Sequence, residues 1–315
     1  MGQDLFTLFA LLGILTGLTF FYGAPLRIIP TSLVLAIILL IGNVGGIFLF
    51  RRVCLRQITP VLPEVVAIGR DWFSFLVILL IYENLLLYTG FIQPDVMDPI
   101  LAEMEILIWS VQPTVWIEQY IHPLAVDLMS IAYAFHFPLS FGLAYGLYLF
   151  NKRAYYREFV TALLFCNIAG FILYLIFPTG PPRFFLESTY HIMPLPSFSG
   201  LYTWTDAFWD GNNPVPIHSS FPSLHVAFST ITLIYAFRKA HWPDSRRWLG
   251  PVVTVMAISL WASTIYLRHH WSLDIIFGWI LGLMSVLVAR YLTTLVAPEP
   301  DFSGLGKTRP PGFLA

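Results

Sequence analysis

Apolar segments recur along the chain, and each has about the 20 residues that a helix needs to cross a hydrocarbon core about 30 Å thick. Only 11% of the residues are charged and 57% are hydrophobic, whereas about a quarter of the residues of a soluble domain are charged. We therefore predict an all-α integral membrane protein. Its predicted helices, about eight in number, cover residues 5–22, 31–50, 73–91, 126–150, 158–177, 223–237, 250–267 and 274–297.

These helices divide the chain into three parts. Residues 1–72 hold N-terminal transmembrane helices and a basic cytoplasmic loop, residues 73–297 form the main membrane bundle, and residues 298–315 form a cytoplasmic tail. No basic residue precedes the first apolar run, so we expect it to be kept as a helix and not removed as a signal peptide. Cys54 and Cys166 show no metal or redox spacing and are interpreted as packing residues.

The distribution of Lys and Arg predicts how the chain is oriented. Short cytoplasmic loops are enriched in these residues, and the predicted helices place all but three of the chain's 17 on one side. The exceptions are Arg27, Arg183 and Arg268. We therefore expect both termini in the cytoplasm and the opposite side to be periplasmic, extracellular or lumenal. The net charge of −1 also argues against a nucleic acid as partner, because a backbone binder needs a concentrated basic surface.

The connection over residues 92–125 belongs to this outer side, because it has acidic residues and no Lys or Arg. Aromatic residues among its aliphatic ones favour a helix that lies in the membrane interface. A lid packed over the helix ends is the alternative. The acidic and aromatic residues are Asp95, Asp98, Glu103, Glu105, Glu118, Trp109, Trp116 and Tyr120.

Three short stretches at the outer ends of the predicted helices contain the residues with the clearest chemistry. They cover residues 177–183, 221–225 and 269–274. Together with Arg268 they bring histidines, a carboxylate and two arginines to one side of the membrane. This combination is suited to binding and transferring a phosphate group.

His270 and Asp274 are four residues apart, so a helix would place them on one face. A carboxylate bonded to one ring nitrogen fixes the tautomer and leaves the other nitrogen able to attack. We interpret His270 as a nucleophile and Asp274 as its orienting partner. The alternative is an interfacial histidine beside an aspartate that caps the helix.

His225 and Ser223 lie at the predicted start of the helix over 223–237, where free N–H groups favour an anion. His225 would protonate the leaving oxygen and later deprotonate the acceptor, a contribution of about 10² to 10⁴ in rate. Ser223 is a candidate for binding phosphate or for capping the helix. A histidine at a helix start also occurs for structural reasons alone.

Arg183 ends a turn stiffened by Pro181 and Pro182, and its planar guanidinium would meet the charge of the phosphate oxygens. An arginine that snorkels to the interface is the alternative. Arg268 is a weaker second candidate for phosphate binding. His269 is interpreted either as solvated or as part of a headgroup pocket.

Other polar residues fall inside apolar segments and are therefore expected to face the bundle interior. Asp127 and His136 are candidates for lining the headgroup pocket, whereas Glu83 is interpreted as a structural contact. Pro138 predicts a kink in the helix over 126–150. The long loop 184–222 is expected to cover the site and contact the headgroup, or merely to pack against it.

The motifs resemble those of the type 2 phosphatidic acid phosphatase superfamily, over roughly residues 120–290. Pro182-Arg183 is similar to the Arg motif, residues 222–225 to the Pro-Ser-Gly-His motif, and residues 270–274 to the His-x-x-x-Asp motif. The resemblance implies a six-helix catalytic bundle and a phosphohistidine intermediate on His270. It also implies that neither a metal nor another cofactor takes part.

Three positions depart from the pattern of the hydrolytic members: Ile176 and Thr264 stand where basic residues are expected, and Leu224 replaces a glycine. The remaining pattern, with its doubled histidine, is closer to the branch that contains inositol phosphorylceramide synthases. This branch implies a phospholipid donor and transfer of a phosphoinositol headgroup to a lipid acceptor.

Two other readings stay open. A lipid-phosphate or polyprenyl-diphosphate phosphatase would use the same histidines with water as acceptor. An anion transporter is disfavoured, because no internal repeat is evident and the key residues lie at helix ends rather than at the midplane.

Overall fold

The fold is known from a computed structural model that describes residues 30–54, 56, 61–73, 96–150, 152–204, 218–238 and 248–295. The predicted helix over 5–22, nearly all of the one over 73–91, Glu83 and the predicted tail over 298–315 lie outside these residues. The described part is helical, without strands, as predicted. Besides helical residues over 61–73 and 201–204, its elements are α2 (Pro30–Val53), α4 (Asp98–Trp109), α5 (Pro113–Trp116), η1 (Ile117–Tyr120), α6 (Pro123–Ala134), α7 (His136–Leu149), α8 (Arg153–Ile176), α9 (Pro182–Phe185), η2 (Glu187–Thr189), α11 (Leu224–Phe237), α12 (Leu249–Tyr266) and α13 (Ser272–Leu295).

Four helical segments of the described part are long and apolar enough to cross a membrane. They are Pro123–Leu149, which joins α6 and α7, then α8, α12, and Ser272–Thr294 within α13. Each corresponds to a predicted helix, and α2 corresponds to the predicted helix over 31–50. The protein is therefore an integral membrane protein.

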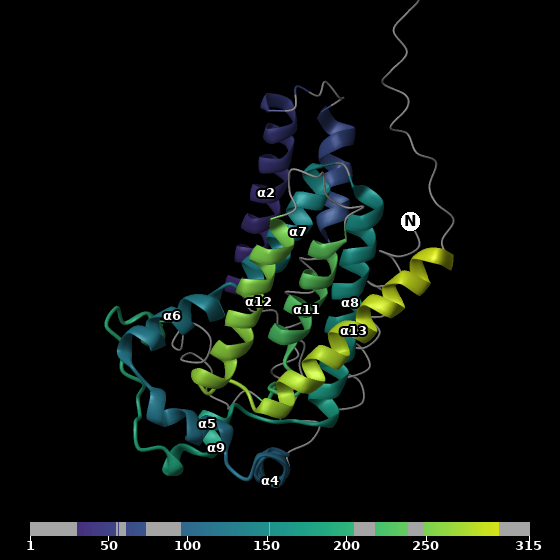
Figure 1. Cartoon of the computed structure of the whole chain (residues 1–315). Coiled ribbons are helices and arrows are strands. Elements are labelled where there is room, and N and C mark those ends of the chain that lie inside the picture. Colours follow the sequence, from purple (N-terminus) through teal and green to yellow (C-terminus); the bar gives the residue numbers. More distant parts are fainter. Residues whose placement is uncertain are drawn as a thin grey trace, which may run out of the picture.

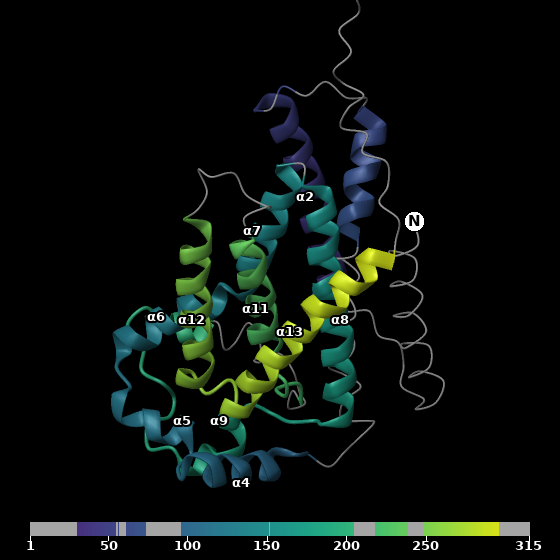
Figure 2. The ribbon, with the colours of Figure 1, turned by 45° about the vertical axis from the view of Figure 1, so that its right-hand side comes forward.

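The short helix α11 lies at the centre of the bundle, packed against α7, α8, α12 and α13 (Figure 1). It has only 14 residues, and residues such as Val226, Ala227 and Ile231 are fully buried. Its N-terminal end points to the same end of the bundle as the end of α8 and the beginning of α13 (Figure 2). The three sequence motifs therefore meet at one end.

The helix predicted over 126–150 is broken in the structure into α6 and α7, which meet at Phe135. Pro138 explains the break, because it has no N–H to donate to the carbonyl oxygen of Ala134 one turn earlier. His136 follows the break, and its Nδ1 lies 3.1 Å from the carbonyl oxygen of Tyr133. The helix is thus interrupted three residues before the proline, close to the position where a kink was expected.

Two glycines bring α13 unusually close to α11. A Cβ atom at Gly278 would lie 2.7 Å from the carbonyl oxygen of Ser223, and one at Gly282 would lie 2.8 Å from that of Ala227. Glycines four residues apart allow such close packing of membrane helices. The contact fixes the beginning of α11 against the first turns of α13.

Helix α4 lies crosswise over the end of the bundle where the motifs meet (Figure 2). Its buried face carries the carboxylates of Asp98 and Glu105 beside the apolar Leu101 and Ala102. Its outward face carries Ile100, Met104 and Leu107, and Leu107 is 84% exposed.

Candidate active site

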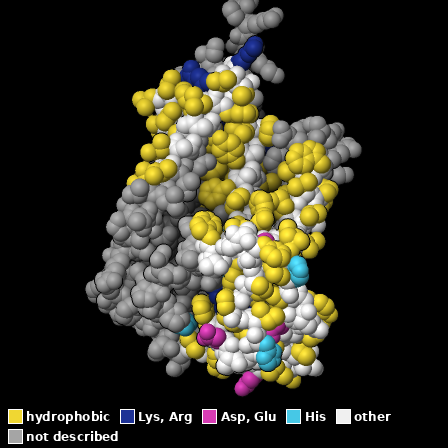
Figure 3. Space-filling model, turned by 90° about the vertical axis from the view of Figure 1, so that its left-hand side faces the viewer, with side chains coloured by type: hydrophobic (Ala, Val, Ile, Leu, Met, Phe, Trp, Pro, Cys, Tyr) yellow, Lys and Arg dark blue, Asp and Glu magenta, His cyan; other side chains and the backbone are white. Residues whose placement is uncertain are grey.

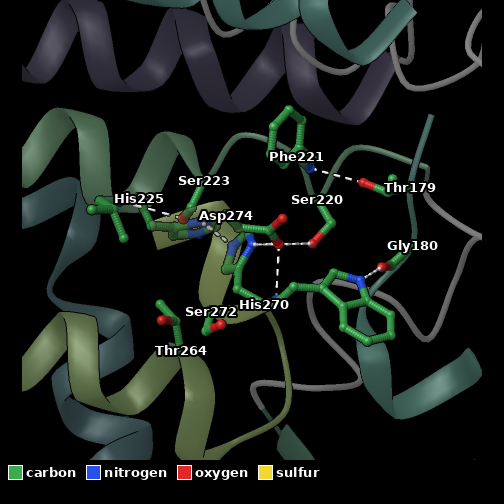
Figure 4. Close-up of polar contacts among 12 residues, drawn as sticks. Thr179, Gly180, Ser220, Phe221, Ser223, His225, Thr264, His270, Ser272 and Asp274 are labelled. Atoms are coloured by element: carbon green, nitrogen blue, oxygen red, sulfur yellow. Dashed lines mark hydrogen bonds and ion pairs between the residues drawn. The ribbon is translucent and has the colours of Figure 1, made fainter. Parts of the chain in front are cut away.

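The three motif segments are joined to one another by backbone hydrogen bonds. Ser220 N–H donates to the carbonyl oxygen of Thr179 over 2.9 Å, Ser223 N–H donates to that of Asp274 over 3.1 Å, and Arg183 N–H donates to that of Arg268 over 3.3 Å. Each bond links two different segments, counting Ser220 and Arg268 as the residues that directly precede the second and third. The chain ends of α8, α11 and α12–α13 therefore form one structural unit (Figure 4).

Asp274 lies in the first turn of α13, and its side chain is fully buried. Its Oδ2 accepts hydrogen bonds from His270 Nδ1 (3.0 Å), Ser220 Oγ (2.6 Å) and Trp271 N–H (2.9 Å). Figure 4 shows these contacts around the carboxylate. A carboxylate held by three donors keeps a fixed position, and it can therefore orient the imidazole of His270.

The hydrogen-bond partners assign the tautomers of two histidines. His270 Nδ1 donates to the carboxylate of Asp274, so Nε2 of the neutral ring carries the lone pair. His225 Nδ1 lies 3.1 Å from this Nε2 and must therefore be the donor. The candidate nucleophile thus faces the N–H of the candidate acid, and a phosphoryl group that reaches His270 Nε2 would displace this contact.

Ser223 precedes α11, and its hydroxyl oxygen accepts a hydrogen bond from Val226 N–H over 3.4 Å. This is the contact of an N-cap residue, one of the two roles considered from the sequence. His225 follows in the first turn of the helix. Binding of phosphate by Ser223 stays a prediction.

Arg183 and His269 lie beside this pair. Arg183 in α9 is buried and donates from Nη1 to His269 Nδ1, and Tyr133 stacks on the imidazole of His269 with ring centroids 4.3 Å apart. Burial and the neighbouring Arg183 hold the pKa of His269 well below its usual range, so the ring is neutral. His269 is therefore buried, and the alternative of a solvated side chain is wrong.

His136 extends the cluster of rings. Its imidazole lies 4.3 Å from that of His225 between centroids, in an edge-to-face arrangement. His136 is the first residue of α7, directly after the break from α6. The structure thus brings His136, His225, His269 and His270 together, although their contribution to a headgroup pocket stays a prediction.

Arg268 and Asp127 are held by other groups. Arg268 is fully buried, and its Nη2 lies 2.9 Å from Glu118 Oε1. Asp127 accepts hydrogen bonds from the hydroxyls of Ser197 and Ser199. The contacts of both side chains are therefore with loop and η1 residues and not with the histidines, so their proposed roles towards the substrate stay predictions.

Sequence reasoning assigned no role in the site to several residues that shape it. Ser220 bonds Asp274, and Glu118 pairs with Arg268. In α4, Asp98 accepts a hydrogen bond from Gly180 N–H over 3.0 Å, and Glu105 accepts one from Ser272 N–H. The spacing of Asp98 and Glu105, two helical turns apart, was a usable signal for a shared helix face.

The structure shows the surroundings of the three residues that depart from the pattern of the hydrolytic members. Ile176 is 49% exposed at the end of α8. The carbonyl oxygen of Thr264 accepts hydrogen bonds from the backbone N–H groups of His269 and His270. Leu224 packs against Gly170, where an added Cβ would lie 2.5 Å from its side chain. An aliphatic side chain and a residue of the backbone turn therefore stand where basic residues were expected, and a packed leucine stands where a glycine was expected.

Comparison with known proteins agrees with this geometry. The family described as the PAP2 superfamily matches residues 107–288, which is more than half of the chain and includes all three motifs. No solved structure matches the chain.

Curated relatives include two synthases and one putative diphosphatase. The chain is 28% identical over 165 residues to a phosphoinositol dihydroceramide synthase of Bacteroides thetaiotaomicron, covering 49% of this chain and 51% of the relative. It is 27% identical over 184 residues to the inositol phosphorylceramide synthase catalytic subunit of Saccharomyces cerevisiae, covering 54% and 42%. It is 34% identical over 73 residues to a putative undecaprenyl-diphosphatase of Escherichia coli, covering 23% and 34%. The matches thus span about half or less of the length of these relatives.

Proposed function

Because the chain belongs to the PAP2 superfamily, we propose that it is a membrane phosphotransferase that moves a phosphoinositol-type headgroup from a phospholipid to a lipid acceptor. The observation that carries the proposal is the contact of His270 Nε2 with His225 Nδ1, with Asp274 behind the nucleophile. The two synthases among the relatives support the choice of headgroup.

In the first step His270 Nε2 attacks the phosphorus atom, and the bond from phosphorus to the diacylglycerol oxygen breaks. His225 enters this step protonated on both nitrogens and gives its Nδ1 proton to the departing oxygen. The headgroup phosphate is then bonded to His270. Asp274 stabilises the positive charge that develops on the ring, and Arg183 is the candidate for binding the phosphate oxygens.

In the second step the hydroxyl of the lipid acceptor attacks phosphorus, and the bond to His270 Nε2 breaks. The neutral His225 takes the hydroxyl proton, which returns both histidines to their starting states. We propose that no metal or other cofactor takes part, because the protein groups named here account for each proton and each charge. If water takes the place of the acceptor, the same steps describe a lipid phosphatase, which is the second candidate function.

The deciding experiment gives purified protein in liposomes a phosphatidylinositol labelled in the headgroup, with and without ceramide, or with a diacylglycerol whose acyl chains differ from those of the donor. We expect a new labelled lipid that depends on the acceptor. Inositol phosphate released at the same rate with and without acceptor would contradict transfer and favour the phosphatase. Phosphatidic acid and a polyprenyl diphosphate are the comparison substrates, since rapid release of phosphate from either would identify a hydrolase.

We further propose that the site faces the outer side of the membrane and that α4 lies in the interface. Figure 3 supports this orientation, because exposed acidic and histidine side chains gather on the lower half of the view and basic ones at the upper end. The outward aliphatic residues of α4 would then contact lipid.

A spin label on Leu107→Cys, with Cys54 and Cys166 replaced by serine and alanine, tests the position of α4. In liposomes we expect the label to be more accessible to oxygen, which concentrates in lipid, than to a water-soluble nickel complex. The same label at Arg52→Cys, on the opposite side, serves as the comparison. The reverse accessibility at position 107 would mean that α4 is a lid in water.

A further inference from the structure

Three protein groups hold the guanidinium of Arg268. Nη2 lies 2.9 Å from Glu118 Oε1, Nη1 donates to the carbonyl oxygen of Ile192 over 2.8 Å, and the guanidinium carbon lies 3.8 Å from the centre of the Tyr190 ring. The side chain is fully buried. An arginine held in this way has its planar donor set directed at fixed partners.

Glu118 connects this arginine to two further segments. Its carboxylate accepts hydrogen bonds from Ile192 N–H (2.7 Å) and His191 N–H (3.1 Å). Although burial alone would raise the pKa of Glu118, these two bonds and the charge of Arg268 hold it below its usual range. The ionised carboxylate therefore joins η1, the loop after η2 and the turn before α13.

The backbone of Arg268 controls the groups that the reaction uses. Its φ of +62° is in the left-handed region, which is uncommon for a residue with a large side chain. Its carbonyl oxygen accepts from Arg183 N–H, and the next two N–H groups, of His269 and His270, both bond the carbonyl oxygen of Thr264. A change in this conformation would move His270 and Arg183 together.

We propose that Arg268 is a positioning residue, and that its ion pair with Glu118 holds the turn before α13 so that His270 faces His225. The inference rests on the proposed function only in that it concerns the same histidines. It differs from a role of Arg268 as a ligand of the substrate phosphate. If Arg268 bound the substrate phosphate, Glu118 would compete with the substrate for the guanidinium. If Arg268 positions the turn, Glu118 and Arg268 act as a unit.

The test compares Glu118→Gln, Arg268→Ala and the double variant, with kcat and KM measured for each. We expect each single variant to lower kcat by about 10- to 100-fold, because a misplaced reacting group costs about this much. KM should change far less, and the double variant should be no slower than the slower single one, since paired residues are not additive.

The opposite pattern would overturn the proposal. If Arg268 binds phosphate, Glu118→Gln leaves kcat unchanged or higher, and Arg268→Ala acts mainly on KM. Should Arg268→Ala not be recovered folded, Glu118→Gln alone decides, because the amide keeps the shape of the side chain and one acceptor oxygen.

Two controls separate this outcome from others. Glu64→Gln breaks the buried pair of Arg51 and Glu64, which are 3.5 Å apart and belong to α2 and the helix over 61–73. It should lower thermal stability without lowering kcat by a comparable factor. The wild-type protein in the same assay tests the proposed function separately. If it hydrolyses the donor instead of transferring the headgroup, kcat of the variants can still be compared with kcat of the wild type.

Discussion

Replacing His270 with alanine is expected to reduce headgroup transfer by about 10³-fold or more, because the variant lacks the atom that would bond to phosphorus. The measurement is the initial rate of labelled product formation from the labelled donor in liposomes. His191→Ala is a matched control, because this histidine is exposed at the same end of the protein and only its backbone N–H has a role described above. We expect it to retain the wild-type rate within about twofold.

The same variant tests the covalent step. Brief mixing of wild-type protein with a donor labelled at phosphorus should give a labelled protein band, which an excess of acceptor should remove. His270→Ala should give no band. Labelled protein that persists in this variant would mean that the phosphate is bonded to another residue, and the neighbouring His225 and His269 would then be the first to examine.

His225→Ala is expected to slow transfer by about 10² to 10⁴, the usual contribution of a general acid or base. Both steps should be affected, because the same nitrogen would give a proton in the first and take one in the second. The loss should appear in kcat rather than in KM, because proton transfer occurs in the transition state.

A donor with a better leaving group separates the two roles of His225. A nitrophenyl ester of the same headgroup phosphate releases an anion that needs no proton, so His225→Ala should then form the covalent intermediate nearly as fast as wild type. The intermediate should accumulate, because the acceptor still lacks its base. Equal slowing on both donors would contradict the role as acid, and no rescue is expected in His270→Ala.

The residues that lie close together in sequence were predictable from it. His270 and Asp274 are one helical turn apart, and the structure joins them by a hydrogen bond of 3.0 Å. The break near Pro138 was predictable for the same reason, since the missing N–H is a property of one residue. The family resemblance, drawn from short motifs, is confirmed by the match over residues 107–288.

The remaining parts depend on contacts between distant segments. Glu118 and Arg268 are 150 residues apart, and no local pattern could pair them. His269 carries the same side chain as His270, yet its burial follows from Tyr133 in α6 and Arg183 in α9. The positions of such residues follow from the packing of the whole bundle rather than from spacing along the chain.

The length of α11 bears on how deep in the membrane the proposed chemistry would take place. His225 and Arg238 are 13 residues apart, about 20 Å along a helix, whereas the hydrocarbon core is about 30 Å thick. If Arg238 marks the cytoplasmic boundary, His225 lies about 10 Å below the opposite surface. If the proposed transfer takes place at that level, where the surrounding hydrocarbon holds little water and dielectric screening is weak, a lipid hydroxyl entering sideways between the helices would reach His270 more readily than a water molecule from outside.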